Sequence, residues 1–201
     1  MRKTRKMKSR IKAFAVGFGA ALTIGGLSLA TQVGQAQQAS GFQLAVDAKG
    51  AIHLPTVDYR KDWVALGSWA VAAEGDAAGS QGIHMVYTQP ESITAFRKTG
   101  KFPDGAILIK ELLTTTTDSM TTGTVSRADK TAGWFVMVKD TNNRFPDNKL
   151  WGDGWGWAYF DAKDRVRTKS TDYVENCKGC HVPAQDTDWV YVQGYPVLNG
   201  P

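Results

Sequence analysis

The sequence predicts an α+β fold, a mainly antiparallel β-sheet with one or two helices packed on it, in one domain over residues 41–201. Three observations support this fold class. Apolar and polar residues alternate with a period of two in several short segments, which is typical of half-buried strands. Clusters of Gly, Pro, Asn and Asp separate these segments, as turns do. One other segment has the length and the terminal residues of a helix.

Four segments are expected to form strands. Two of them alternate clearly, residues 82–89 (GIHMVYTQ) and 105–113 (GAILIKELL). Residues 133–140 (GWFVMVKD) form a short buried run, and residues 154–160 (GWGWAYF) alternate large with small side chains. The turn-rich stretches TGKFPDG and DTNNRFPDN flank these segments, so the strands are expected to pair with antiparallel neighbours.

Residues 90–100 (PESITAFRKTG) are expected to form a helix. Pro90 suits a first helical turn, Glu91 complements the positive end of the helix dipole, and Gly100 is a natural residue just after the last turn. The Thr-rich stretch at 114–124 is the one low-complexity segment, and it is expected to be a solvated loop between strands.

The first forty residues have the pattern of an export signal. Seven basic residues and no acid precede an apolar run at 13–30, and small residues follow it. Residues 1–36 are therefore expected to be a signal peptide cleaved after Ala36, with Ala39 as the second choice, and the mature protein is expected in the periplasm. The alternative is an uncleaved membrane anchor, although the run is rich in Gly and Ala and so weakly hydrophobic for a span.

The net charge changes sign once this leader is set aside. The whole chain carries a formal charge of +5, and the leader supplies +7, so the remainder carries −2. The basic composition therefore belongs to the leader and gives no support for nucleic-acid binding. About 160 residues remain, which is the size of one ordinary domain with its own core.

The motif CKGCH near the C-terminus holds both cysteines of the chain, Cys177 and Cys180, with His181 directly behind them. A structural disulfide is permitted in an exported protein, but so short a loop would stabilise little. A zinc site needs four ligands, and the other histidines, His53 and His84, are far upstream. Covalent haem explains all three residues, because two thiols at this spacing add to the vinyl groups of one porphyrin edge and the imidazole binds the iron. We therefore predict one c-type haem at the C-terminus, with His181 as the proximal iron ligand.

The second axial position of the iron is expected to be open. Electron-transfer cytochromes commonly fill it with a methionine downstream of the motif, yet no Met or His follows His181. Met85, Met120 and Met137 lie upstream and are more simply core or loop residues. An open position favours gas binding or small-molecule chemistry over pure electron transfer.

Three blocks of the chain resemble the cytochrome P-460 family, which includes cytochrome c′-beta. They are DYRKDWVALGS at 58–68, HMVYTQPESITAFRKTGKFPDGAILIKELL at 84–113, and CKGCHVPAQDTDWVYVQGYPVL at 177–198. The resemblance runs from about Gly41 to the C-terminus. It implies a β-sheet haem domain, commonly a homodimer.

The resemblance also gives Lys110 a role. Family members that oxidise hydroxylamine join a lysine covalently to a meso carbon of the porphyrin, in the strand after an FPDG turn, and Lys110 occupies that position. The alternation places Ala106, Leu108 and Lys110 on one face of the strand, where an apolar setting favours the neutral, nucleophilic amine. The alternative is a lysine whose ammonium extends to water.

Three further residues are candidate distal groups. Hydroxylamine-oxidising members can carry an arginine where this chain has His84, whose imidazole could donate a hydrogen bond or relay a proton. A carboxylate for proton removal is also expected, and Asp172 and Glu175 are the candidates near the haem motif. The alternative for His84 is an ordinary strand histidine with satisfied hydrogen bonds.

The resemblance implies a haem-dependent oxidoreductase that converts hydroxylamine, with nitric oxide, to nitrous oxide and passes electrons to a partner cytochrome. A protein of another class, a non-catalytic nitric oxide binder or sensor of the cytochrome c′-beta type, is the alternative. A plain electron carrier is the third possibility.

Overall fold

The computed structural model describes residues 41–75 and 77–199. The predicted leader and its cleavage position lie outside the described residues. Within the described part of the chain, no helix is long and apolar enough to cross a membrane.

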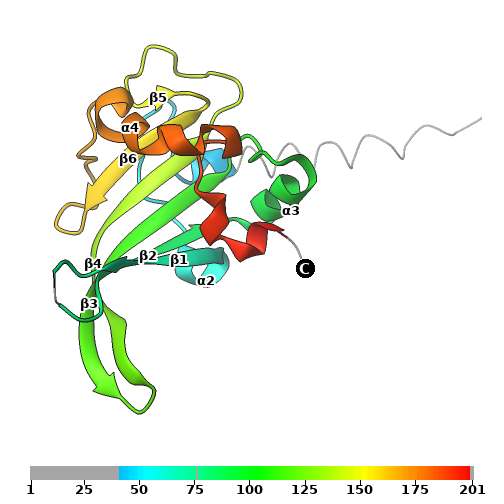
Figure 1. Ribbon diagram of the computed structural model, residues 1–201. Coiled ribbons are helices and arrows are strands. Elements are labelled where there is room, and N and C mark those ends of the chain that lie inside the picture. Colours follow the sequence, from blue (N-terminus) through cyan, green and yellow to red (C-terminus); the bar gives the residue numbers. More distant parts are fainter. Residues whose placement is uncertain (1–40, 76, 200–201) are drawn as a thin grey trace, which may run out of the picture.

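The core of the fold is a six-stranded, fully antiparallel sheet with the strand order β1-β2-β3-β4-β6-β5 (Figure 1). Its strands span Val64–Ala72 (β1), Ser80–Thr88 (β2), Ile107–Met120 (β3), Gly123–Lys139 (β4), Trp151–Gly152 (β5) and Trp155–Asp161 (β6). Almost every strand pairs with its neighbour in the sequence. The prediction of a mainly antiparallel α+β fold is confirmed, and all four expected strand segments lie in this sheet.

Few helices accompany the sheet. The longest one among the described residues, α3 (Pro90–Thr99), has Pro at its first turn and ends at Gly100, whose φ of 70° is the left-handed conformation that glycine adopts without strain. This confirms the predicted helix and both of its end signals. The others are short: α2 (Tyr59–Asp62), η1 (Val174–Lys178), α4 (Gly179–His181), η2 (Val182–Thr187), η3 (Val192–Gly194) and η4 (Pro196–Asn199).

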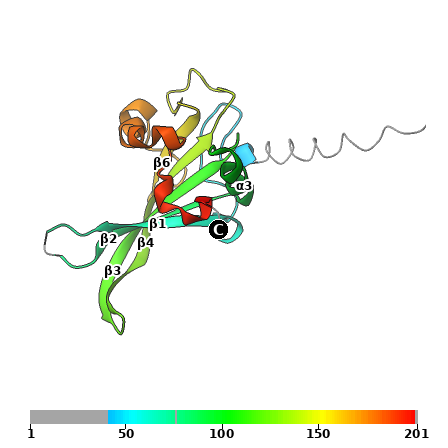
Figure 2. The ribbon, with the colours of Figure 1, turned by 45° about the vertical axis from the view of Figure 1, so that its right-hand side comes forward.

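The Thr-rich stretch is not the loop that the sequence predicted. Residues 114–120 continue β3, and β4 begins at Gly123, so the two strands form a long hairpin that projects away from the rest of the sheet (Figures 1 and 2). Threonine is β-branched and suits strands, and Thr117 and Ser126 hydrogen-bond across the pair at 2.7 Å. The β-propensity of threonine and cross-strand pairing outweighed the polar composition.

Two separate cores lie on the two faces of the sheet. The C-terminal segment from η1 to η4 covers one face, and the segment before β1 covers the other (Figure 2). The predicted alternation in β3 is confirmed, because Ala106 and Leu108 pack in the core beneath the C-terminal segment while Ile107 and Ile109 pack in the opposite one. Consecutive residues of β3 therefore point alternately into the two cores.

Candidate functional site

A cavity of about 560 Å³ lies between the C-terminal segment and the sheet. Its volume is in the range of cofactor and ligand sites. The C-terminal segment forms one wall and strands β1, β2, β3, β4 and β6 form the other, so residues far apart in the sequence meet here. The lining includes Trp69, His84, Val86, Leu108, Lys110, Phe135, Met137, Trp157, Cys177, Cys180, His181, Val190, Tyr191 and Tyr195.

Both cysteines of the motif lie in this lining as free thiols, Cys177 buried and Cys180 exposed. The backbone is helical from Val174 through His181, which brings residues three apart to the same side of the segment. The side chain of Asn176 fixes the start of the segment by accepting hydrogen bonds from the backbone N–H groups of Thr171 and Asp172, at 2.8 and 3.1 Å. The motif is thus presented to the cavity by a short, locally braced helix.

The imidazole of His181 is oriented by the chain that follows it. Its Nδ1 lies 2.7 Å from the carbonyl oxygen of Trp189, so Nδ1–H donates to that carbonyl and Nε2 is left free to bind a metal. The indole of Trp157 meets the imidazole edge-on, with ring centroids 4.8 Å apart. Burial lowers the pKa of His181 below its usual value, which favours the neutral form that a metal requires.

Lys110 extends from β3 into the same cavity. Its neighbours on the adjacent strands are apolar, Val86 on β2 and Phe135 on β4, and its Nζ lies 4.8 Å from the centroid of the Phe135 ring. In the described part of the chain, no carboxylate lies within ion-pair distance of this amine. Burial therefore lowers the pKa of Lys110, with a smaller opposing effect from Cys180.

His84 also lines the cavity, from β2 between Trp69 of β1 and Leu112 of β3. Burial, and secondly the charge of Lys110, lowers the pKa of His84. Its imidazole is therefore held neutral, a form that can both donate and accept a hydrogen bond.

Asp172 and Glu175 lie outside the cavity. Asp172 accepts a hydrogen bond from the backbone N–H of Val174 at 2.9 Å and lies 3.7 Å from the ammonium of Lys149, so it braces the start of η1. Glu175 is exposed to solvent. Among the described residues that line the cavity, none is an Asp or a Glu. The predicted distal carboxylate stays a prediction, and His84 is the titratable distal candidate that the fold brings to the site.

Three residues that line the cavity were not among the site residues predicted from the sequence. Met137 is 8% exposed and lines the cavity from β4. Trp157 contacts His181, and the hydroxyl of Tyr191 donates to the carbonyl of Cys180. The alternation of large and small side chains in residues 154–160 predicts a strand, but only the fold shows that Trp157 faces the motif.

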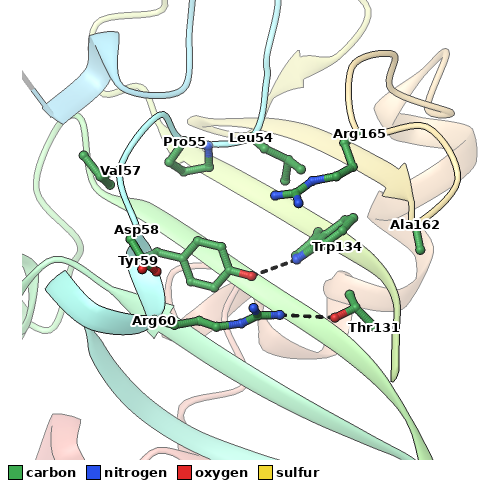
Figure 3. A pocket seen from close by; sticks show the side chains of 10 residues that line it. All are labelled: Leu54, Pro55, Val57, Asp58, Tyr59, Arg60, Thr131, Trp134, Ala162 and Arg165. Carbon is green, nitrogen blue, oxygen red and sulfur yellow. Dashed lines mark hydrogen bonds between the residues drawn. The ribbon is translucent and has the colours of Figure 1, made fainter. Parts of the chain in front are cut away.

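A second pocket, of about 430 Å³, lies on the opposite face of the sheet (Figure 3). Arg60, which lines this pocket, pairs through its guanidinium with Glu111, the residue next to Lys110 on β3, whose side chain is 1% exposed. Thr131 donates a further hydrogen bond to Glu111 at 2.8 Å, and Trp134 donates one to the Tyr59 hydroxyl at 2.8 Å. None of the predicted site residues lies in this pocket.

The cavity under the C-terminal segment fits a haem. Two thiols and a free imidazole nitrogen stand on one wall, and most of the other side chains that line it are apolar or aromatic, as a porphyrin plane requires. Outside the haem motif, the described residues contain no cluster of His, Cys, Asp or Glu that could hold a metal ion.

The model of the family described as Cytochrome P460 matches residues 56–192, which include α2 through η2 and the whole haem motif. The chain belongs to the cytochrome P460 family. Membership makes it a haem-binding cytochrome, in a family of haem oxidoreductases. No curated protein matches the chain in a direct comparison.

Proposed function

We propose that the chain is an exported mono-haem c-type cytochrome that oxidises hydroxylamine together with nitric oxide. One molecule of each gives nitrous oxide, water, one proton and one electron, and the electron leaves to a partner cytochrome. The haem supplies the electron-accepting iron and an open coordination position. Thioethers from Cys177 and Cys180 and the Nε2 of His181 would hold it.

One observation carries the proposal: Lys110 and the CKGCH motif line one cavity, although they are far apart in the sequence. The amine is buried, and no carboxylate of the described chain pairs with it. Burial lowers the pKa of this amine, so its neutral, nucleophilic form is more accessible than in an exposed lysine. Joining it to a porphyrin meso carbon removes one hydrogen from each partner, which is a two-electron oxidation, so a two-electron oxidant must accept them.

The side chains around the haem have separable tasks in this proposal. His84 donates a hydrogen bond to the bound substrate and accepts the proton that the reaction releases. Trp69, Phe135 and other aromatic side chains exclude water from the cavity. The proposal leaves the distal position open and gives Met137, which lines the cavity, a packing role.

The deciding experiment is the absorption spectrum of the ferrous protein matured with haem c, with a tryptic digest. A crosslinked macrocycle shifts the spectrum strongly to the red, and the digest yields one haem-bearing species that contains both the Lys110 and the Cys177 regions. Lys110→Leu should restore an ordinary haem c spectrum, end hydroxylamine turnover and retain nitric oxide binding. The exposed Lys163→Leu serves as the control and should change none of these. A wild-type digest that releases a free peptide ending at Lys110 rules out the crosslink.

A second candidate function is supported by the contact of Lys110 with Phe135. An ammonium 4.8 Å from a ring centroid is in range of a cation–π interaction, which stabilises an unmodified lysine. An unmodified Lys110 fits a non-catalytic nitric oxide binder or sensor. The same digest separates the two functions. Periplasmic location and homodimeric assembly belong to either proposal and are testable by fractionation and by light scattering.

A further inference from the structure

The carbonyl that orients His181 stands in a strained turn. Asp188 and Trp189 both have positive φ, 60° and 67°, and they follow one another in the chain. Left-handed backbone is unusual for any residue with a Cβ and a clear outlier for one as bulky as Trp. Such strain persists only where the surroundings fix it, so this turn requires anchors.

Asp188 supplies the anchors. Its Oδ2 accepts a hydrogen bond from the backbone N–H of Phe102 at 2.9 Å, and its Oδ1 accepts one from the ammonium of Lys139 at 2.6 Å. Its backbone carbonyl accepts a hydrogen bond from the indole of Trp155 at 3.0 Å. The turn is therefore tied to the segment before β3, to the end of β4 and to the start of β6.

The Lys139–Asp188 pair is buried. The two side chains are only 9% and 4% exposed. An ion pair this deep is weak evidence for stability as such, because desolvation opposes the attraction between the charges. This pair instead fixes the position of the neighbouring Trp189 carbonyl, which accepts the hydrogen bond from Nδ1 of His181. The hydrogen bond at the second nitrogen of a metal-binding imidazole sets the tautomer, orientation and basicity of that imidazole.

We propose that Lys139 and Asp188 are positioning residues for His181, and that through the Trp189 carbonyl they set the strength of the bond between His181 and the haem iron. The inference rests on the haem-binding part of the proposed function alone. It needs neither hydroxylamine chemistry nor a crosslink at Lys110.

The test uses the haem-loaded protein and two variants, Asp188→Asn and Lys139→Met. Asn keeps the shape of Asp and tolerates positive φ, and Met keeps the length of Lys. The iron–histidine stretching vibration of the ferrous protein, measured by resonance Raman, should move to lower frequency in both. The reduction potential should become more positive, because a less basic imidazole stabilises ferric iron less. The double variant should shift no further than either single one, since the pair acts as a unit.

Asp140→Asn is the matched control. The Asp140 carboxylate is equally buried, at 4%, and is also ion-paired, to Arg144. Its hydrogen bonds go to Asn142 and Arg144, and within the described chain none of them reaches the 188–189 turn. The Asp140→Asn variant should lose stability but keep the wild-type iron–histidine stretching frequency and reduction potential. If Asp188→Asn and Lys139→Met lose stability in the same way and retain the wild-type frequency and potential, the pair is only structural and the proposal is overturned.

If Lys139→Met folds poorly, a milder substitution can replace it. Lys139→Arg keeps the charge and changes only the reach and shape of the donor, so it is the milder substitution for the same two readouts. A variant that folds by circular dichroism but takes up no haem, while Asp140→Asn takes it up, supports the proposal. If the wild type does not turn over hydroxylamine, the proposed function is wrong, but the comparison of the Asp188 and Lys139 variants with Asp140→Asn is still valid.

Discussion

Neighbouring residues of β3 place a charged group on each face of the sheet. On one face, Glu111 is almost completely buried and its carboxylate is matched by Arg60 and Thr131. On the other, Lys110 lines a larger cavity with apolar neighbours and no carboxylate within ion-pair distance in the described chain. The charge of Glu111 is therefore compensated by its neighbours, whereas that of Lys110 is not.

This difference indicates that Glu111 contributes to the stability of the fold, whereas Lys110 is available for chemistry. A buried charge is tolerated when a partner and hydrogen bonds compensate for its lost hydration, as they do for Glu111. Lys110 lacks that compensation, so burial shifts it toward the neutral amine. Removing partners on the Glu111 face should damage the fold, whereas substitutions on the Lys110 face should change the chemistry first.

The largest effect is expected from Arg60→Ala. This variant leaves the Glu111 carboxylate buried with only Thr131 as a donor, so the free energy of unfolding should fall by about 3 kcal/mol. Denaturant unfolding of the haem-loaded protein measures it. Arg127→Ala is the control, because its pair with Asp118 is more than half exposed on both sides and should contribute about 0–1 kcal/mol. Equal losses in the two variants would remove the contrast between the faces.

On the haem face, His84→Gln should reduce hydroxylamine turnover by about 100-fold, the usual contribution of a general base, and leave stability nearly unchanged. The pKa of His84 is lowered from 6.5, so the neutral base persists to lower pH. The acid limb of the wild-type rate profile should therefore lie below pH 6.5. His53→Gln, on a histidine that is not among those lining the cavity, is the control. Full activity of His84→Gln would show that a group other than His84 accepts the proton released in the reaction.

Met137→Leu tests whether the haem face holds a hidden iron ligand. Met137 lines the cavity, but the proposed open position gives it a packing role only. A volume-conserving substitution should change the free energy of unfolding by less than about 1.5 kcal/mol. The ferric protein should stay mainly high-spin in wild type and variant. A wild-type methionine-to-iron charge-transfer band that disappears in Met137→Leu would instead favour the electron carrier.

The smallest effect is expected from Tyr59→Phe on the opposite face. The hydroxyl accepts the Trp134 indole hydrogen bond, so its loss should cost about 1 kcal/mol at neutral pH. Burial raises the pKa of Tyr59 from 10.0 to about 12. The unfolded chain loses this proton first, so wild-type stability should fall as the pH rises from 10 toward 12, while the Phe variant escapes that loss. If the difference in unfolding free energy between the wild type and Tyr59→Phe does not narrow above pH 10, the raised pKa of Tyr59 is contradicted.

The parts of the fold that depend on local signals could be predicted from the sequence. Gly100 and Pro90 mark the ends of α3, and the period of two in β3 places Leu108 and Lys110 on one face. The 114–124 stretch was misjudged, since its pairing with residues across the hairpin matters more than its polarity. Composition describes a segment alone, whereas a strand depends on its partner.

The site was only partly accessible for the same reason. The CKGCH motif is local and could be recognised from spacing. Proximity in the sequence suggested Asp172 and Glu175, yet neither lines the cavity: Asp172 lies before η1 and accepts a hydrogen bond from its first residue, and Glu175 is exposed on η1. Met137 and Trp157 reach it from distant strands. The ion pairs of Glu111 and Asp188 join residues far apart in the sequence, so no local pattern marks them.

The order of elements along the chain also implies an order of assembly. Strands β1 to β4 and β6 pair mainly with neighbours in the sequence, and the sheet is complete at Asp161, before the first residue of the haem motif. Pairings between neighbouring elements form quickly because little loop entropy is lost. We expect the sheet wall, with Lys110 and His84 already in position, to form before the segment with the cysteines closes over it. Haem capture would then be a late step on a prepared surface.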